Sequence, residues 1–146
     1  MKYLIAIILF TFLSCESQVK KPMGNILTFE TINQFSYPII KGDFQVLNSQ
    51  EKIDAVYAII HSKTEGNRLA PIPAYTEDET YFVFKPSSKS KNEVEVTEIS
   101  LQGKTLNINL KESTVSAHPN EMISPYILMK IPEKIVVEKI NSQSIK

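Results

Sequence analysis

The chain has 146 residues with 16 acidic and 16 basic side chains, one cysteine and no tryptophan. A neutral balance without a basic excess gives no reason to expect nucleic-acid binding. A single cysteine excludes an internal disulfide and a cysteine-rich metal site, and the length suits one domain of ordinary size.

The first fifteen residues have the pattern of an export signal. Lys2 precedes an apolar run at 3–13, which is long enough for a signal-peptide core but too short to span a bilayer as a helix. The run ends in FLSC, residues 12–15, which resembles the lipobox of bacterial lipoproteins, although Phe12 stands where leucine is commoner. The resemblance implies that residues 1–14 are a lipoprotein signal peptide and that Cys15 is acylated after cleavage.

Acyl chains on Cys15 would hold the protein on a lipid bilayer, because each buried methylene contributes about 0.8 kcal/mol. We therefore expect a protein of the cell envelope, in the outer membrane if the cell has one. The alternative is an ordinary secretory signal followed by a free cysteine.

Residues 15–34 are mostly polar and show no sustained period, which predicts a flexible tether with a short strand at 26–29. A single globular domain is expected at 35–140. It begins with a strand at 44–47 and a helix at 49–62, for which Asn48 and Glu51 are spaced as a capping box. Four apolar residues at helical spacing predict the buried face of this helix: Ile53, Val56, Tyr57 and Ile60.

The second half predicts strands. Two prolines make 69–75 an extended connector, and TYFVF at 80–84 has the composition of a buried strand. A hairpin is expected between EVEVTEISL and TLNINL, with a bulge near Thr97 or Glu98 where the apolar phase shifts. Strands are expected at 125–131 and 134–140, before a frayed tail at 141–146. The fold class is α+β and mostly β, an antiparallel sheet or small β-sandwich with one helix packed on it.

Residues that could carry chemistry are sparse. His61 and His118 have no second ligand at metal spacing, and the acidic run at 77–79 does not have the alternating pattern of a calcium loop. The serine and lysine run at 85–91 contains no glycine to close on a phosphate, and no desolvated lysine to activate a serine. We expect no cofactor and no enzymatic activity.

Residues 80–138 resemble the C-terminal domain of the PrcB family of protease-complex subunits from bacterial surfaces. The resemblance is carried by QGKTL at 102–106 and by SPY at 124–126 through Ile131-Pro132. The family's Gly-Gly-Tyr turn is replaced here by residues 88–92, which contain neither glycine nor tyrosine. The resemblance implies a non-enzymatic, membrane-tethered accessory domain that contacts an envelope protein, with a surface protease as one candidate.

The sequence therefore predicts docking through loops at one end of the sheet, at 64–79, 85–92 and 113–124, because prolines reduce the entropy that a loop loses on binding. The candidate contact residues are Pro71, Pro73, Tyr75, Pro86, Ser88, Lys89, Lys91 and His118. Three alternatives remain open. The first is a small-ligand-binding lipoprotein or an enzyme with a pocket between helix and sheet, the second is a chagasin-like protease inhibitor, and the third is a domain with only a packing or spacing role in an envelope assembly.

Overall fold

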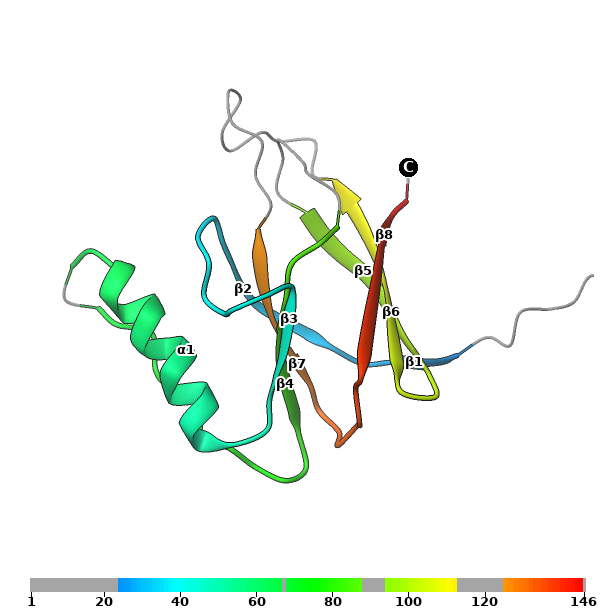
Figure 1. The fold of residues 1–146 in the computed structure, drawn as a ribbon, viewed down its shortest axis with the longest axis horizontal. Coiled ribbons are helices and arrows are strands. Elements are labelled where there is room, and N and C mark those ends of the chain that lie inside the picture. Colours follow the sequence, from blue (N-terminus) through cyan, green and yellow to red (C-terminus); the bar gives the residue numbers. More distant parts are fainter. Residues whose placement is uncertain (1–23, 67, 88–93, 113–124, 146) are drawn as a thin grey trace, which may run out of the picture.

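A computed structural model describes residues 24–66, 68–87, 94–112 and 125–145. In these ranges the chain forms one helix and eight strands (Figure 1), namely β1 (Asn25–Leu27), β2 (Glu30–Phe35), β3 (Phe44–Leu47), α1 (Gln50–Lys63), β4 (Thr80–Phe84), β5 (Val94–Gln102), β6 (Thr105–Glu112), β7 (Tyr126–Ile131) and β8 (Lys139–Ser144). The predicted lipidation site Cys15 lies outside the described residues, as do Ser88, Lys89, Lys91 and His118.

The elements form three layers, with the helix on one side of a β-sandwich (Figure 1). The inner sheet has the strand order β2-β7-β4-β3 and lies between α1 and the outer sheet, whose order is β1-β5-β6-β8. The expected fold class, α+β and mostly β with a helix packed on a small sandwich, is confirmed.

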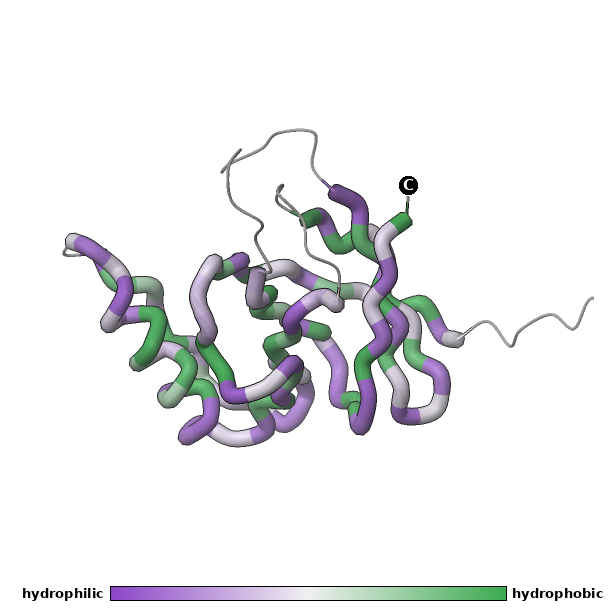
Figure 2. Tube along the Cα trace, turned by 45° about the horizontal axis from the view of Figure 1, so that its top comes forward, coloured by the Kyte–Doolittle hydropathy of each residue, from purple (hydrophilic) through white to green (hydrophobic). Residues whose placement is uncertain are grey.

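The inner sheet is buried on both faces, and β4 shows this most clearly. Tyr81 and Val83 pack in the apolar cluster beneath the helix, whereas Phe82 and Phe84 pack in the cluster between the sheets. All five residues of the strand are buried, as the sequence predicted. The outer sheet is covered on one face alone, so along its strands hydrophilic residues alternate with hydrophobic ones (Figure 2).

The helix follows its predicted pattern closely. The four apolar residues of the predicted stripe are all buried against the inner sheet. The N-cap, however, is Ser49 and not Asn48: the Ser49 hydroxyl accepts a hydrogen bond from the backbone N–H of Lys52 at 3.3 Å. The Asn48 side chain instead accepts from the Lys52 ammonium at 2.7 Å.

The predicted hairpin is confirmed as β5 and β6, joined by a tight turn in which Gly103 has φ +62°. Its register shifts between Val96 and Glu98, so the predicted bulge is also confirmed. The bulge lets Val94 and Val96 before it, and Ile99 after it, all enter the core between the sheets.

Three boundaries differ from the sequence-based prediction. The expected tether at 15–34 includes β1 and most of β2, because Leu27 is buried in the core and β1 pairs with β5. The strand expected at 134–140 is a turn over much of that range, and β8 begins at Lys139. The expected frayed tail at 141–146 therefore holds most of β8, which pairs with β6 in parallel, unlike every other strand pair among the described residues.

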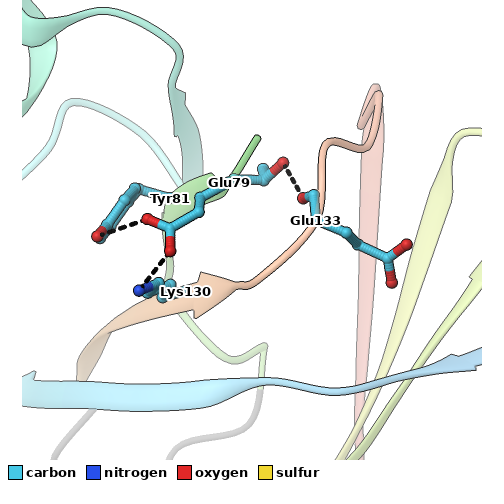
Figure 3. A network of polar contacts seen from close by, with 5 residues as sticks. Glu79, Tyr81, Lys130 and Glu133 are labelled. Atoms are coloured by element: carbon cyan, nitrogen blue, oxygen red, sulfur yellow. Dashed lines mark hydrogen bonds and ion pairs between the residues drawn. The ribbon is translucent and has the colours of Figure 1, made fainter. Parts of the chain in front are cut away.

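Thr80 fixes the turn that leads into β8. It is a buried polar residue, 4% exposed, at the start of β4. Its hydroxyl donates to the carbonyl oxygen of Glu133 at 2.9 Å (Figure 3) and accepts from the N–H of Ile135 at 3.0 Å. Ile135 and Val137 can thus pack against the core from a turn instead of a strand.

Candidate functional site

One side of the sandwich has edge strands from both sheets. β3 is the edge of the inner sheet and β8 the edge of the outer sheet. On the opposite side the chain itself passes from β1 to β2, and the side-chain amide of Gln34 donates to the carbonyl of Val94, which connects the two sheets. The β3–β8 side is therefore where a groove between sheets can form.

A short clasp crosses from one edge to the other. The backbone N–H of Lys85 donates to the carbonyl of Asp43, just before β3, at 2.7 Å. Two residues on, the N–H of Ser87 donates to Oγ of Ser142 in β8 at 3.2 Å, and its hydroxyl donates to the Ser142 carbonyl at 3.3 Å. Pro86 lies between these anchors and is buried, and its fixed φ stiffens the clasp.

The clasp, β3 and β8 surround a cleft of about 550 Å³. Its apolar side is formed by Phe44, Phe84 and Ile140, of which Phe84 is fully buried. Its polar side is formed by the clasp and by Asp43, Asn141 and Ser142. The cleft thus combines an apolar wall with backbone and side-chain hydrogen-bonding groups of two sheet edges.

Opposite charges border this cleft. Asp43 is exposed at the start of β3. The Lys85 ammonium lies 5.7 Å from the ring centroid of Tyr126, a geometry suited to a cation–π interaction. A ligand in the cleft would meet the Asp43 carboxylate and the Lys85 ammonium, which already contacts the Tyr126 ring. The site therefore has no strong preference for ligands of one charge.

The structure places the predicted contact residues in two regions. Pro86 lies in the cleft, and the described residues flanking 88–93 and 113–124 belong to the same end of the sandwich, since Val94 pairs with Glu112 and Phe84 with Ile127. The connector at 68–79 enters β4 at the opposite end of that strand. The prediction that all three loops share one end is therefore wrong for 64–79.

The connector with Pro71, Pro73 and Tyr75 runs along α1 instead. His61 Nε2 lies 2.8 Å from the carbonyl of Ala70 near the end of the helix. At the start of the helix, the side chain of Gln50 donates to the Pro73 carbonyl at 3.2 Å and accepts from the Tyr75 N–H at 2.7 Å. The stiff connector thus braces the helix, which is a structural use of its prolines.

A polar network ties the acidic run before β4 to β7 (Figure 3). The Glu79 carboxylate lies 2.7 Å from the Lys130 ammonium and accepts a hydrogen bond from the Tyr81 hydroxyl at 3.3 Å. The hydrogen bond with Lys130 lowers the pKa of Glu79 and raises that of Lys130. Burial, followed by the charge of Glu79, raises the pKa of Tyr81. The shifts of Glu79 and Lys130 favour their paired, charged state, and the shift of Tyr81 keeps its hydroxyl neutral, so the network acts as a latch between strands.

Within residues 24–66, 68–87, 94–112 and 125–145, no three histidine, cysteine or acidic side chains gather as a metal site. His61 packs edge-on against the Tyr57 ring, with centroids 6.0 Å apart. In the same ranges no helix has the length and hydrophobicity needed to cross a bilayer.

Sequence reasoning missed the contribution of β8 to the cleft. Its residues KINSQS include one apolar residue in the interior, Ile140, so their composition indicated a tail. One apolar residue, Ile140, was too little signal to separate this segment from a polar coil.

Comparison with protein-family models, with curated proteins and with solved structures found no match to this chain. The PrcB resemblance therefore stays a prediction, and the cleft has to be interpreted from its own geometry.

Proposed function

We propose that this protein is a lipid-anchored, non-enzymatic docking module of the bacterial envelope, and that its cleft between β3 and β8 binds an extended segment of an envelope protein. The observation that carries this proposal is that the edge strands of the two sheets border one cleft with an apolar wall between them. A surface protease is one candidate partner, as the resemblance to PrcB implies.

Edge strands favour this kind of recognition. An extended segment can add to a sheet through main-chain hydrogen bonds while its alternate side chains enter pockets. β3 has the sequence FQVL and carries neither charge nor proline, the usual devices that protect an edge from pairing. Ile140 and Phe44 then supply apolar contacts for the side chains of the bound segment.

The anchor is proposed from the first fifteen residues. Acylation of Cys15 would confine the domain to a membrane surface, where a docking module meets its partner at a raised effective concentration. The matched test compares the wild-type chain with Cys15→Ala in the source cell. The proposal expects the variant to lose lipid labelling and membrane association, and normal processing with retained membrane association would refute it.

The docking test uses a tagged chain of residues 16–146, which keeps every described residue, on detergent-solubilised membranes of the source cell. Asp43→Lys reverses an exposed charge at the cleft, and Ile140→Lys places a charge on its apolar wall. Asp78→Lys, an equal charge reversal at the other end of β4, is the control. Thermal melting verifies that each variant is folded.

A stoichiometric partner that binds the wild type and the Asp78→Lys control, but neither cleft variant, would support the proposal. A partner retained by all variants would place the interface elsewhere. If no partner binds any of the chains, the second candidate function, a small-ligand site in the cleft, is favoured. The cleft volume of about 550 Å³ supports it, because typical ligand pockets have similar volumes. Mass spectrometry of the protein purified under native conditions would then detect a bound molecule.

No residue of α1 lines any of three hollows in the described part of the chain, so none of these three is the small-ligand pocket expected between helix and sheet. The chagasin-like alternative predicts inhibition of a cysteine protease by the turn at 88–92. An inhibition assay with a papain-type protease separates it from docking alone.

A further inference from the structure

The uncovered face of the outer sheet is a second surface of the protein, and its side chains differ in chemistry from those of the cleft. The register places Glu98, Asn109 and Gln143 in one row across β5, β6 and β8. Ser100, Asn107 and Asn141 form the next row, with Ile26 of β1 beside Ser100. We call these two rows the amide face.

Hydrogen bonds between strands hold its side chains in place. Asn141 donates to Asn107 at 3.2 Å, and Gln143 donates to Asn109 at 2.8 Å. Asn109 in turn donates to Glu98 at 3.2 Å. Four amides and one carboxylate are therefore oriented before any ligand arrives, which reduces the entropy that binding would cost.

The face is hollowed. A shallow depression of about 650 Å³ is lined by residues of all four strands, from Ile26 of β1 to Gln143 of β8. Three strand spacings of about 4.8 Å give it a width of roughly 14 Å, so a chain of several linked rings can lie across the sheet.

Its lining selects the chemistry of the occupant. It contains amides, hydroxyls and one carboxylate, but no lysine, arginine or aromatic residue. Nucleic acids and acidic polymers would find no cation, and a hydrophobic peptide would find one exposed apolar side chain, Ile26, 63% exposed. Sugar hydroxyls both donate and accept, as primary amides do, so an uncharged glycan matches this face group by group.

The amides retain hydrogen-bonding capacity for such a partner. An amide has two donor hydrogens and a carbonyl acceptor. The bond between Asn107 and Asn141 uses one acceptor and one donor, so within the described residues the Nδ2 group of Asn107 and the Oδ1 atom of Asn141 remain for a ligand. Ser100 and Gln102 line the depression without joining the amide bonds.

We infer that the amide face binds an uncharged polysaccharide, laid across the four strands of the outer sheet. This inference does not depend on the proposed docking cleft or on the lipid anchor: although Asn141 and Ser142 line both hollows, the docking test changes Asp43 and Ile140, and neither of these lines the depression of the amide face.

The test is titration of isotope-labelled residues 16–146 with soluble cello-, malto-, xylo- and chitohexaose, followed by NMR. The side-chain NH₂ signals of Asn107, Asn109, Asn141 and Gln143 report directly on the face. The expected result is a saturable shift of these signals with at least one hexasaccharide, together with weaker shifts elsewhere.

Variants separate binding from the structural role of the amides. Ser100→Ala/Gln102→Ala removes polar groups that do not hold β8, and we expect it to weaken binding about tenfold, the effect of losing two ligand hydrogen bonds. Asn107→Ala should weaken binding at least as much. Asn25→Ala, an amide of β1 outside the depression, is the matched control and should bind like the wild type.

Several results would overturn the inference. Unshifted amide signals with all four hexasaccharides would do so, and so would shifts that the Ser100→Ala/Gln102→Ala variant leaves unchanged. Concentration-dependent shifts without any sugar would assign the face to a second copy of the chain instead. The docking test is unaffected by these outcomes, since it relies on Asp43 and Ile140.

Discussion

Replacement of Thr80 by valine tests how the fold holds the turn before β8. Thr80→Val preserves the shape of the side chain but removes a hydroxyl that makes two hydrogen bonds, one to Glu133 and one from Ile135. Each bond contributes about 0.5–1.5 kcal/mol net, and the two backbone groups would be left without this partner. We therefore expect the free energy of unfolding to fall by about 2 kcal/mol.

Two measurements check this value. A domain of this size loses roughly 3–5 °C of Tm per kcal/mol, so thermal melting should show a decrease of roughly 6–10 °C. Hydrogen exchange then locates the change, because the amide of Ile135 should lose protection in the valine variant.

Thr80→Ser is the matched control, since it keeps the hydroxyl and removes one methyl group, which costs about 0.8 kcal/mol. Its Ile135 amide should stay protected. Equal protection of this amide in the wild type and in the Thr80→Val variant would refute the role given to the hydroxyl.

Three further predictions concern other parts of the fold. Glu79→Gln removes the ion pair with Lys130. Because folding lowers the pKa of Glu79, the wild type should be the more stable protein at pH 7. Denaturant melts should show this advantage shrinking as the pH falls below about 4.3. Gly24→Ala should destabilise β1, since a Cβ there would lie 2.7 Å from the backbone oxygen of Leu101, and exchange of the β1 amides should accelerate. Ser49→Ala should cost about 1 kcal/mol of stability, whereas Asn48→Ala should cost clearly less, and equal losses would contradict the assignment of the cap.

The sequence predicted most accurately the elements whose spacing of apolar residues is determined by burial. The helix stripe repeats at helical spacing because one face alone meets the inner sheet, and the phase shift in β5 is visible because a bulge returns the following residues to the core. The buried strand β4 was equally clear, since both of its faces need apolar side chains.

Other elements depend on contacts that composition does not reveal. Because Ile135 and Val137 are apolar, the segment at 134–140 was predicted as a strand. They reach the core from a turn held by Thr80 instead. β8 is attached through its backbone and through amide pairs, so its residues resemble a polar tail. Asn48 and Ser49 can both cap a helix, and only the geometry chooses between them.

The candidate site was predicted in part. Proline-rich segments indicated binding loops, and Pro86 does lie in the cleft. Pro71 and Pro73 follow the helix instead, because the connector has to return along α1 to the far end of β4. The second side of the cleft comes from β8, which is distant in the sequence and could not be associated with Pro86 beforehand.

The complete burial of β4 also has a consequence for aggregation of the chain before it folds. TYFVF is an uncharged run of aromatic and β-branched residues without proline, the composition of segments that aggregate as stacked strands when exposed. In the sequence it is bracketed by acidic residues at 77–79 and by Lys85 with Pro86. Such flanking charges and prolines act as gatekeepers in unfolded chains. We therefore expect the acidic run that latches β4 to β7 in the folded protein also to protect this segment from aggregation before the chain has folded.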